Sequence, residues 1–166
     1  MRHKPTLKYN GLTVLLDNPS RFDNCELISG YAGHLFQGAL SVPRQACDIR
    51  LLNTLGEGFL PDTKVILLLG QKSLTTFKNI SLGEQRGCPW MAHNRTYIAT
   101  FLPQDAIDRK AYFNPLSNET EMEYETVRHG KTKRSNWRFW MLRDVSKAAQ
   151  YLKNPPRPES GELITY

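Results

Sequence analysis

The sequence predicts an α/β domain, a three-layer α/β/α sandwich around a central, mainly parallel four-stranded sheet. The chain has 166 residues, the usual length of one domain with a single core. Four short apolar runs bounded by turn residues alternate with stretches that have helical periodicity. Strands that alternate with helices are joined by right-handed crossovers, which make neighbouring strands parallel.

The four expected strands are short and rich in leucine and β-branched residues. They lack the strict alternation of apolar and polar residues that is typical of a sheet with one solvent-exposed face, which indicates that helices cover both faces. Their ranges are Thr13–Leu16, Ile49–Leu52, Lys64–Leu69 and Thr96–Phe101.

The expected helices show apolar residues three or four positions apart. They are Tyr31–Leu40, Gln71–Asn79 directly after Gly70, and Asn136–Leu152. Residues 1–153 are therefore predicted to form the domain. Residues 154–166 begin with Asn-Pro-Pro-Arg-Pro, and this composition is typical of a linker or tail because proline fixes φ and removes a donor.

Composition narrows the functional class. The net charge of +6 and pI near 9.3 favour a polyanionic partner such as DNA. The longest apolar run, Val65–Leu69, is strand-sized, and no signal-peptide pattern follows Met1, so we expect a cytoplasmic protein without a membrane contact. Three widely spaced cysteines without a Cys-x-x-Cys pair argue against a disulfide framework, and we expect no metal and no cofactor.

The segments that follow the expected strands hold the candidate site. Ligands of open α/β sheets bind at the carboxyl ends of the strands. Four segments would meet there, namely Leu16–Ser20, Ser29–Gly33, Asn53-Thr54 and Thr100–Gln104. Each one alone is also explained by ordinary turn chemistry.

Taken in order, these segments resemble the uracil-DNA glycosylase superfamily, especially its iron–sulfur branch, from about Leu12 to Leu152. The stretch Pro61–Leu74 is similar to that family's central strand, glycine and following helix, and Gly30–Gly33 is similar to its Gly-x-Ala-Gly helix start. The other matching positions are Arg86-Gly87, Thr100–Pro103, Trp137, Asp144 and Lys147.

The resemblance implies a pocket for a base flipped out of DNA. It assigns Asp17 and Asn18 to the catalytic motif that positions water or stabilises the sugar cation. Asn53 would read the uracil edge, which suits an amide because it both donates and accepts. Ile28 and Leu102 fall on the remaining base-binding positions.

Several positions depart from the family pattern. Leu102-Pro103-Gln104 stands where the family has His-Pro-Ser, so the donor to uracil O2 is missing. Ile28 has no aromatic face for stacking, and Ser20 replaces a glycine. The four cysteines that hold the cluster are absent, so we expect no iron–sulfur centre.

Polar and basic residues outside the pocket are expected to contact DNA. These are Ser20, Arg21, Gln104, Arg128, Lys131, Lys133 and Arg134. The last four lie in the segment 117–134, which changes from acidic to basic and has two interpretations. It is either a solvated loop or a basic arm that touches phosphates.

The leading hypothesis is a DNA-binding domain of glycosylase fold with a degenerate active site, serving replication or repair. In some phage family-A polymerases a domain resembling this superfamily precedes the exonuclease, so a DNA polymerase or another replication protein is an expected partner. The alternatives are an active uracil or deaminated-base glycosylase, and a protein-interaction domain that kept only the fold.

Other residues have a plain structural interpretation. Trp137 and Trp140, interleaved with Arg138, are expected in the core, with stacking on nucleic acid as the alternative. His34 is expected on the surface or at a helix cap, and Cys88 is expected to be a small buried residue.

Overall fold

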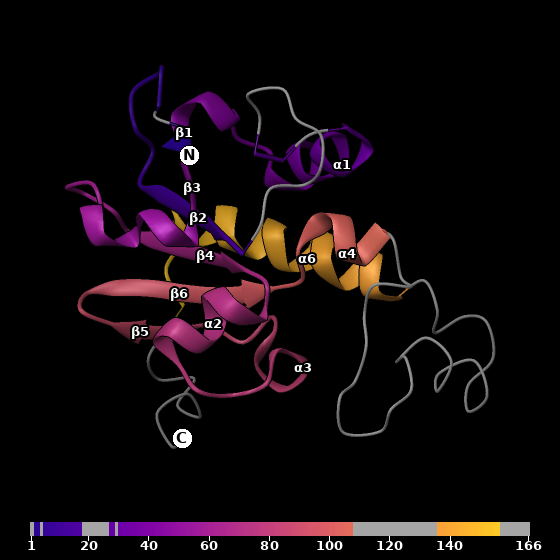
Figure 1. Cartoon of the computed structure of the whole chain (residues 1–166). Coiled ribbons are helices and arrows are strands. Elements are labelled where there is room, and N and C mark those ends of the chain that lie inside the picture. Colours follow the sequence, from indigo (N-terminus) through magenta and orange to yellow (C-terminus); the bar gives the residue numbers. More distant parts are fainter. Residues whose placement is uncertain (1, 4, 18–26, 29, 108–135, 157–166) are drawn as a thin grey trace, which may run out of the picture.

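The computed structural model describes residues 2–3, 5–17, 27–28, 30–107 and 136–156 (Figure 1). These residues form a six-stranded sheet in the order β1-β3-β2-β4-β6-β5. Its strands are β1 (Arg2–His3), β2 (Leu12–Leu16), β3 (Asp48–Leu51), β4 (Val65–Leu69), β5 (Trp90–Ala92) and β6 (Arg95–Thr100).

The centre of the sheet is parallel and its edges are antiparallel. β3, β2, β4 and β6 pair in parallel, whereas β1 and β5 pair antiparallel to β3 and β6. The α/β class is therefore confirmed, but the expected four-stranded sheet was wrong because it omitted both edge strands. β1 has two residues and β5 has three, and runs this short do not mark a strand in the sequence.

The helices cover both faces of the sheet. The crossover from β2 to β3 and the one from β4 to β6 run in opposite directions along the sheet, so right-handed connections place them on opposite faces. One layer contains α1 (Gly30–Leu40), α4 (Pro103–Ile107) and α6 (Asn136–Tyr151), which pack against one another (Figure 1). The other contains α2 (Gln71–Phe77) and α3 (Leu82–Gln85), which contact β4 and β6.

The predicted long helices agree with the structure to within two residues at each end. The sequence analysis missed α3, α4 and two short 3₁₀ segments, η1 (Arg44–Ala46) and η2 (Leu52–Glu57), which are too short to show a helical period. α6 ends at Tyr151, four residues before Pro155. No helix in the described part of the chain is long and apolar enough to cross a bilayer.

A buried thiol at the start of β3 predicts how stability depends on pH. Burial raises the pKa of Cys47, whose Sγ accepts a hydrogen bond from Asn10 Nδ2 at 3.4 Å. The folded protein therefore keeps a proton that the unfolded chain loses above about pH 8.5, the pKa of a free thiol. Stability should fall as the pH rises from this value towards the pKa of the folded thiol.

Urea unfolding at neutral and alkaline pH checks this expectation. Burial also raises the pKa of Tyr9 and Tyr97, so the whole protein should lose stability in the same direction. Cys47→Ala isolates the thiol, and its stability should decline less steeply with pH than that of the wild type. Equal slopes for the two proteins would contradict the assignment to Cys47.

Candidate functional site

Two of the four segments predicted to hold a site lie, in their described parts, at the carboxyl edge of the parallel strands, next to the end of β4. Asp17 follows β2, Gly70 follows β4, and Phe101-Leu102 follow β6. Backbone hydrogen bonds join these strand ends, from Asp17 N to Leu69 O at 3.2 Å and from Gly70 N to Thr100 O at 3.0 Å. The connections after β2 and β4 leave for opposite faces, which makes the gap between these strand ends the switch point where α/β proteins bind ligands.

The Asp17 carboxylate lies at this switch point and caps α2. Its Oδ1 accepts hydrogen bonds from Ser73 N at 2.6 Å and Ser73 Oγ at 2.7 Å, and its Oδ2 accepts one from Lys72 N at 2.9 Å. Three of about four acceptor positions on this carboxylate are thus occupied by the protein itself. This arrangement holds Asp17 in place and leaves it about one acceptor position for a water molecule.

Gly70 allows the carboxylate to approach α2 this closely. Its φ is +109°, and a Cβ at this position would lie 2.3 Å from Asp17 Oδ2. Gly70 is therefore required for two reasons: the strand–helix turn needs a positive φ, and no side chain fits beside the Asp17 carboxylate.

Asn53 is exposed on η2, which follows β3. The buried Arg50 holds this segment in place: its Nε donates to Thr54 Oγ1 at 3.1 Å, its Nη1 donates to Gly58 O at 2.6 Å, and its Nη2 donates to Thr54 O. The sequence analysis missed Arg50. A single arginine inside the apolar run Ile49–Leu52 was the signal that could have indicated a buried, multiply bonded guanidinium.

The structure places the other two base-binding candidates in or against the core. Ile28 is 1% exposed, and its carbonyl accepts a hydrogen bond from Arg44 Nη1 at 2.6 Å. A Cβ on Gly33 would lie 2.5 Å from the same carbonyl oxygen, which explains the second glycine of the Gly-x-Ala-Gly stretch. Leu102 is half-buried and packs against the core, so it offers an apolar surface and no donor.

Among the predicted DNA-contacting residues, Gln104 is half-buried on α4. The remaining site residues lie outside the described part of the chain. They are Asn18, Ser20, Arg21, Arg128, Lys131, Lys133 and Arg134.

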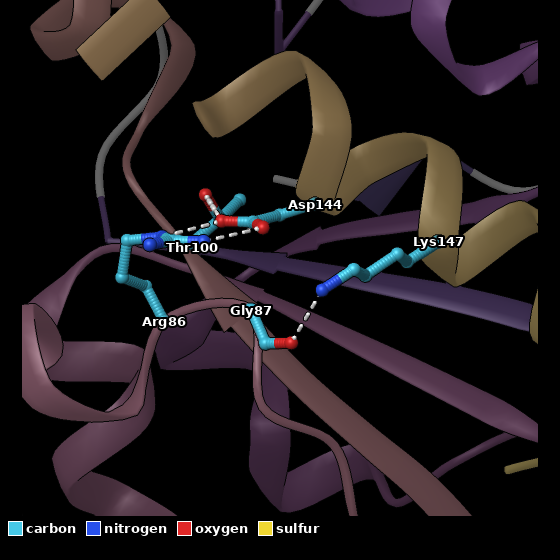
Figure 2. Close-up of polar contacts among 5 residues, drawn as sticks. All are labelled: Arg86, Gly87, Thr100, Asp144 and Lys147. Atoms are coloured by element: carbon cyan, nitrogen blue, oxygen red, sulfur yellow. Dashed lines mark hydrogen bonds and ion pairs between the residues drawn. The ribbon is translucent and has the colours of Figure 1, made fainter. Parts of the chain in front are cut away.

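Three separate segments of the chain that carry the family resemblance meet around Asp144 of α6 (Figure 2). Arg86 Nε and Nη2 donate to Asp144 Oδ2 and Oδ1, both at 2.9 Å, and Thr100 Oγ1 donates to Oδ2 at 2.7 Å. Asp144 is fully buried, and its hydrogen bond raises the pKa of the Arg86 guanidinium further above its ordinary value. The cluster joins α6 to the end of β6 and to the turn after α3.

Gly87 and Lys147 complete this cluster. Lys147 Nζ donates to Gly87 O at 3.0 Å (Figure 2), and Gly87 N donates to Ala99 O of β6 at 2.9 Å. Gly87 has φ +76°, and a Cβ there would lie 2.6 Å from Asp144 Oδ1. The motif residues Arg86, Gly87 and Asp144 therefore serve packing and charge neutralisation in the fold.

Aromatic and cationic side chains alternate along the first turns of α6. Trp137 is 7% exposed beside Phe101, which confirms the expected core position. Trp140 is half-buried with Arg86 and Arg143 over its ring, at 4.8 and 5.5 Å. Arg138 lies 5.7 Å from the ring centre of the exposed Tyr31.

Two minor expectations have opposite outcomes. His34 is exposed on α1, as expected. Cys88 was expected to be buried and is exposed instead, because it lies in the turn between α3 and β5. Within the described ranges, no three His, Cys, Asp or Glu side chains gather in a group that could hold a metal ion.

Comparison of the sequence with models of protein families gave no match, and comparison with curated proteins gave none either.

Proposed function

We propose that this chain is a DNA-binding domain of uracil-DNA glycosylase fold whose active site is degenerate, and that it serves DNA replication or repair in the cytoplasm. The observation that carries the proposal is the convergence of Asp17, Gly70 and Leu102 at the carboxyl edge of the parallel strands. This edge is where the resemblance requires the pocket for a flipped base. A replication protein such as a DNA polymerase is the proposed partner.

The start of α6 supports a role in DNA binding. Trp137 lies beside Phe101, so α6 begins at the same edge as the candidate pocket. The basic residues Arg128, Lys131, Lys133 and Arg134 come just before α6 in the sequence, and Arg138 lies on its first turn. A segment rich in Lys and Arg that leads into this helix would suit the phosphates that flank a bound nucleotide.

The chemistry of the edge supports weak or absent catalysis. Leu102 cannot stabilise charge on a departing base, because it has no hydrogen-bond donor. The hydrogen bonds of Asp17 to α2 restrict its use as the group that positions water. The side chain of Ile28 is buried in the core and has no exposed surface for stacking.

The proposal predicts absent or very slow release of uracil from a single-stranded oligonucleotide. Loss of one preorganised donor costs about 10²–10³ in rate in well-studied enzymes. A gel assay for alkali-labile sites with wild type, Asn18→Ala and Leu102→His measures the effect, and Leu102→His should raise activity only modestly. Brisk cleavage by the wild type that disappears in Asn18→Ala would establish the alternative, an active glycosylase.

Binding to the same oligonucleotide without uracil should depend on salt. The logarithm of the affinity should fall with the logarithm of salt concentration, with a slope of about −0.7 for each phosphate contact on a single strand. The triple variant Lys131→Glu, Lys133→Glu and Arg134→Glu should bind more weakly and show a shallower slope. The matched control reverses Lys8, Lys64 and Lys153, three exposed lysines outside the basic segment. Equal affinity and slope for wild type and the first triple variant would assign the segment to a solvated loop.

A further inference from the structure

An apolar groove runs between α1 and α6 and is lined by residues other than Asp17, Gly70 and Leu102. α1 and α6 lie against each other (Figure 1), and the groove has a volume of about 430 Å³. α1 lines it with His34, Leu35, Gly38 and Ala39, and α6 lines it with Phe139, Leu142 and Arg143. Phe139 is 55% exposed and adds a large apolar surface to the groove.

The lining residues follow the helical repeat on both walls. Leu35 and Ala39 are four residues apart on α1, and Phe139 and Leu142 are three apart on α6. A Cβ on Gly38 would have nothing within 4 Å, so the floor of the groove is open at this position. Grooves of this kind accept the apolar stripe of an amphipathic helix.

Arg143 is the charged residue among those that line the groove in the described part of the chain, and it is a cation. His34 and Arg143 lie at its rim, and α1 contains no acidic residue. The sole acidic residue of α6 is Asp144, which is fully buried and paired with Arg86. The two helices therefore present no exposed carboxylate of their own beside Arg143, and a ligand with negative charge would complement this side chain.

We propose that the groove binds an acidic amphipathic helix of another protein. Apolar residues of that helix at positions i, i+3 or i+4 and i+7 would lie on Leu35, Leu142 and Phe139, and its flanking carboxylates would face Arg143 and His34. The floor is aliphatic apart from Phe139, whereas single-stranded nucleic acid is bound on successive aromatic platforms. This difference favours a protein partner over DNA. The inference does not depend on the proposed DNA binding.

A synthetic helical peptide of about four turns provides the probe. It carries leucine on one stripe and glutamate on the flanks, with a fluorescent label for anisotropy titration against the full chain. Two control peptides replace either the leucines with serine or the glutamates with lysine. The acidic leucine peptide should bind, and each control peptide should bind at least about tenfold more weakly, which corresponds to about 1.4 kcal/mol.

Three protein variants locate the binding site. Arg143→Glu and Phe139→Ala should each weaken binding about tenfold, and Gly38→Leu should abolish it by filling the floor. All three positions are exposed, so the fold should tolerate the changes. Lys153→Glu, at an exposed position beyond the end of α6, makes the same charge change as Arg143→Glu and should leave binding unaltered.

Three results would overturn the inference. The first is an absence of peptide binding by the wild type, and the second is equal binding by the lysine peptide or by the groove variants. The third is displacement of the peptide by an oligothymidine whose own binding requires Phe139 and an open Gly38, which would make nucleic acid the occupant. If the chain bound no oligonucleotide but still bound the peptide, the proposed DNA-binding function would fail and the inference about the groove would stand.

Discussion

Replacing Arg86 with alanine should lower the free energy of unfolding by about 3–5 kcal/mol, the usual cost of removing one partner of a buried ion pair. Asp144 is fully buried, and its two oxygens accept hydrogen bonds from Arg86 at 2.9 Å. Without the guanidinium, a carboxylate would remain in the core with the Thr100 hydroxyl as its other hydrogen-bond donor in this cluster. The cost is high because the charge cannot reach water from this position.

Urea denaturation of Arg86→Ala measures this cost, and Arg143→Ala is the matched control. Both arginines lie over the ring of Trp140, at 4.8 and 5.5 Å, but only Arg86 also contacts Asp144. Loss of Arg143 should therefore cost about 0.5–1 kcal/mol, the value of an exposed cation–π contact. The double variant Arg86→Ala with Asp144→Ala should be more stable than the sum of the single effects implies, because it leaves no unpaired buried charge. Equal losses for Arg86→Ala and Arg143→Ala would refute the role of the ion pair.

Gly70→Ala should destabilise the protein by about 2–5 kcal/mol, from the combined costs of overpacking and of a strained φ. The new Cβ would lie 2.3 Å from Asp17 Oδ2, and the backbone at this residue has φ +109°. Asp17 would have to leave the first turn of α2, which would also remove its bonds to Lys72 N and Ser73 N. One methyl group would thus disturb the strand–helix turn and the candidate catalytic residue together.

Gly38→Ala is the control for this variant. Gly38 lies within α1, and a Cβ there would meet nothing within 4 Å. Alanine should stabilise the protein at this position by about 0.5–1 kcal/mol, because glycine is a poor helix former. Chemical denaturation of both variants tests the pair, and a similar stability for Gly70→Ala and wild type would show that the turn can relax around the new methyl group.

The sequence by itself determined the parallel part of the sheet and the three longer helices. The four parallel strands and the three longer helices follow from local apolar periodicity, and each lies within two residues of its expected ends. The positions of Asp17 and Leu102 at strand ends also follow from the sequence, because parallel strands place their carboxyl ends at one edge. The edge strands β1 and β5 could not be predicted from the sequence. They are defined by hydrogen bonds to a neighbouring strand, and two or three residues are too few to show a periodic pattern.

The roles of the side chains at the site were decided only by the tertiary structure. The family resemblance implied a catalytic role for Asp17, but its three hydrogen bonds come from residues 55 and 56 positions away. In the same way, Arg86 and Asp144 are 58 positions apart, and no local pattern indicates that they pair. Sequence periodicity reports which face of an element is apolar, whereas a hydrogen bond or an ion pair depends on which distant element packs against that face.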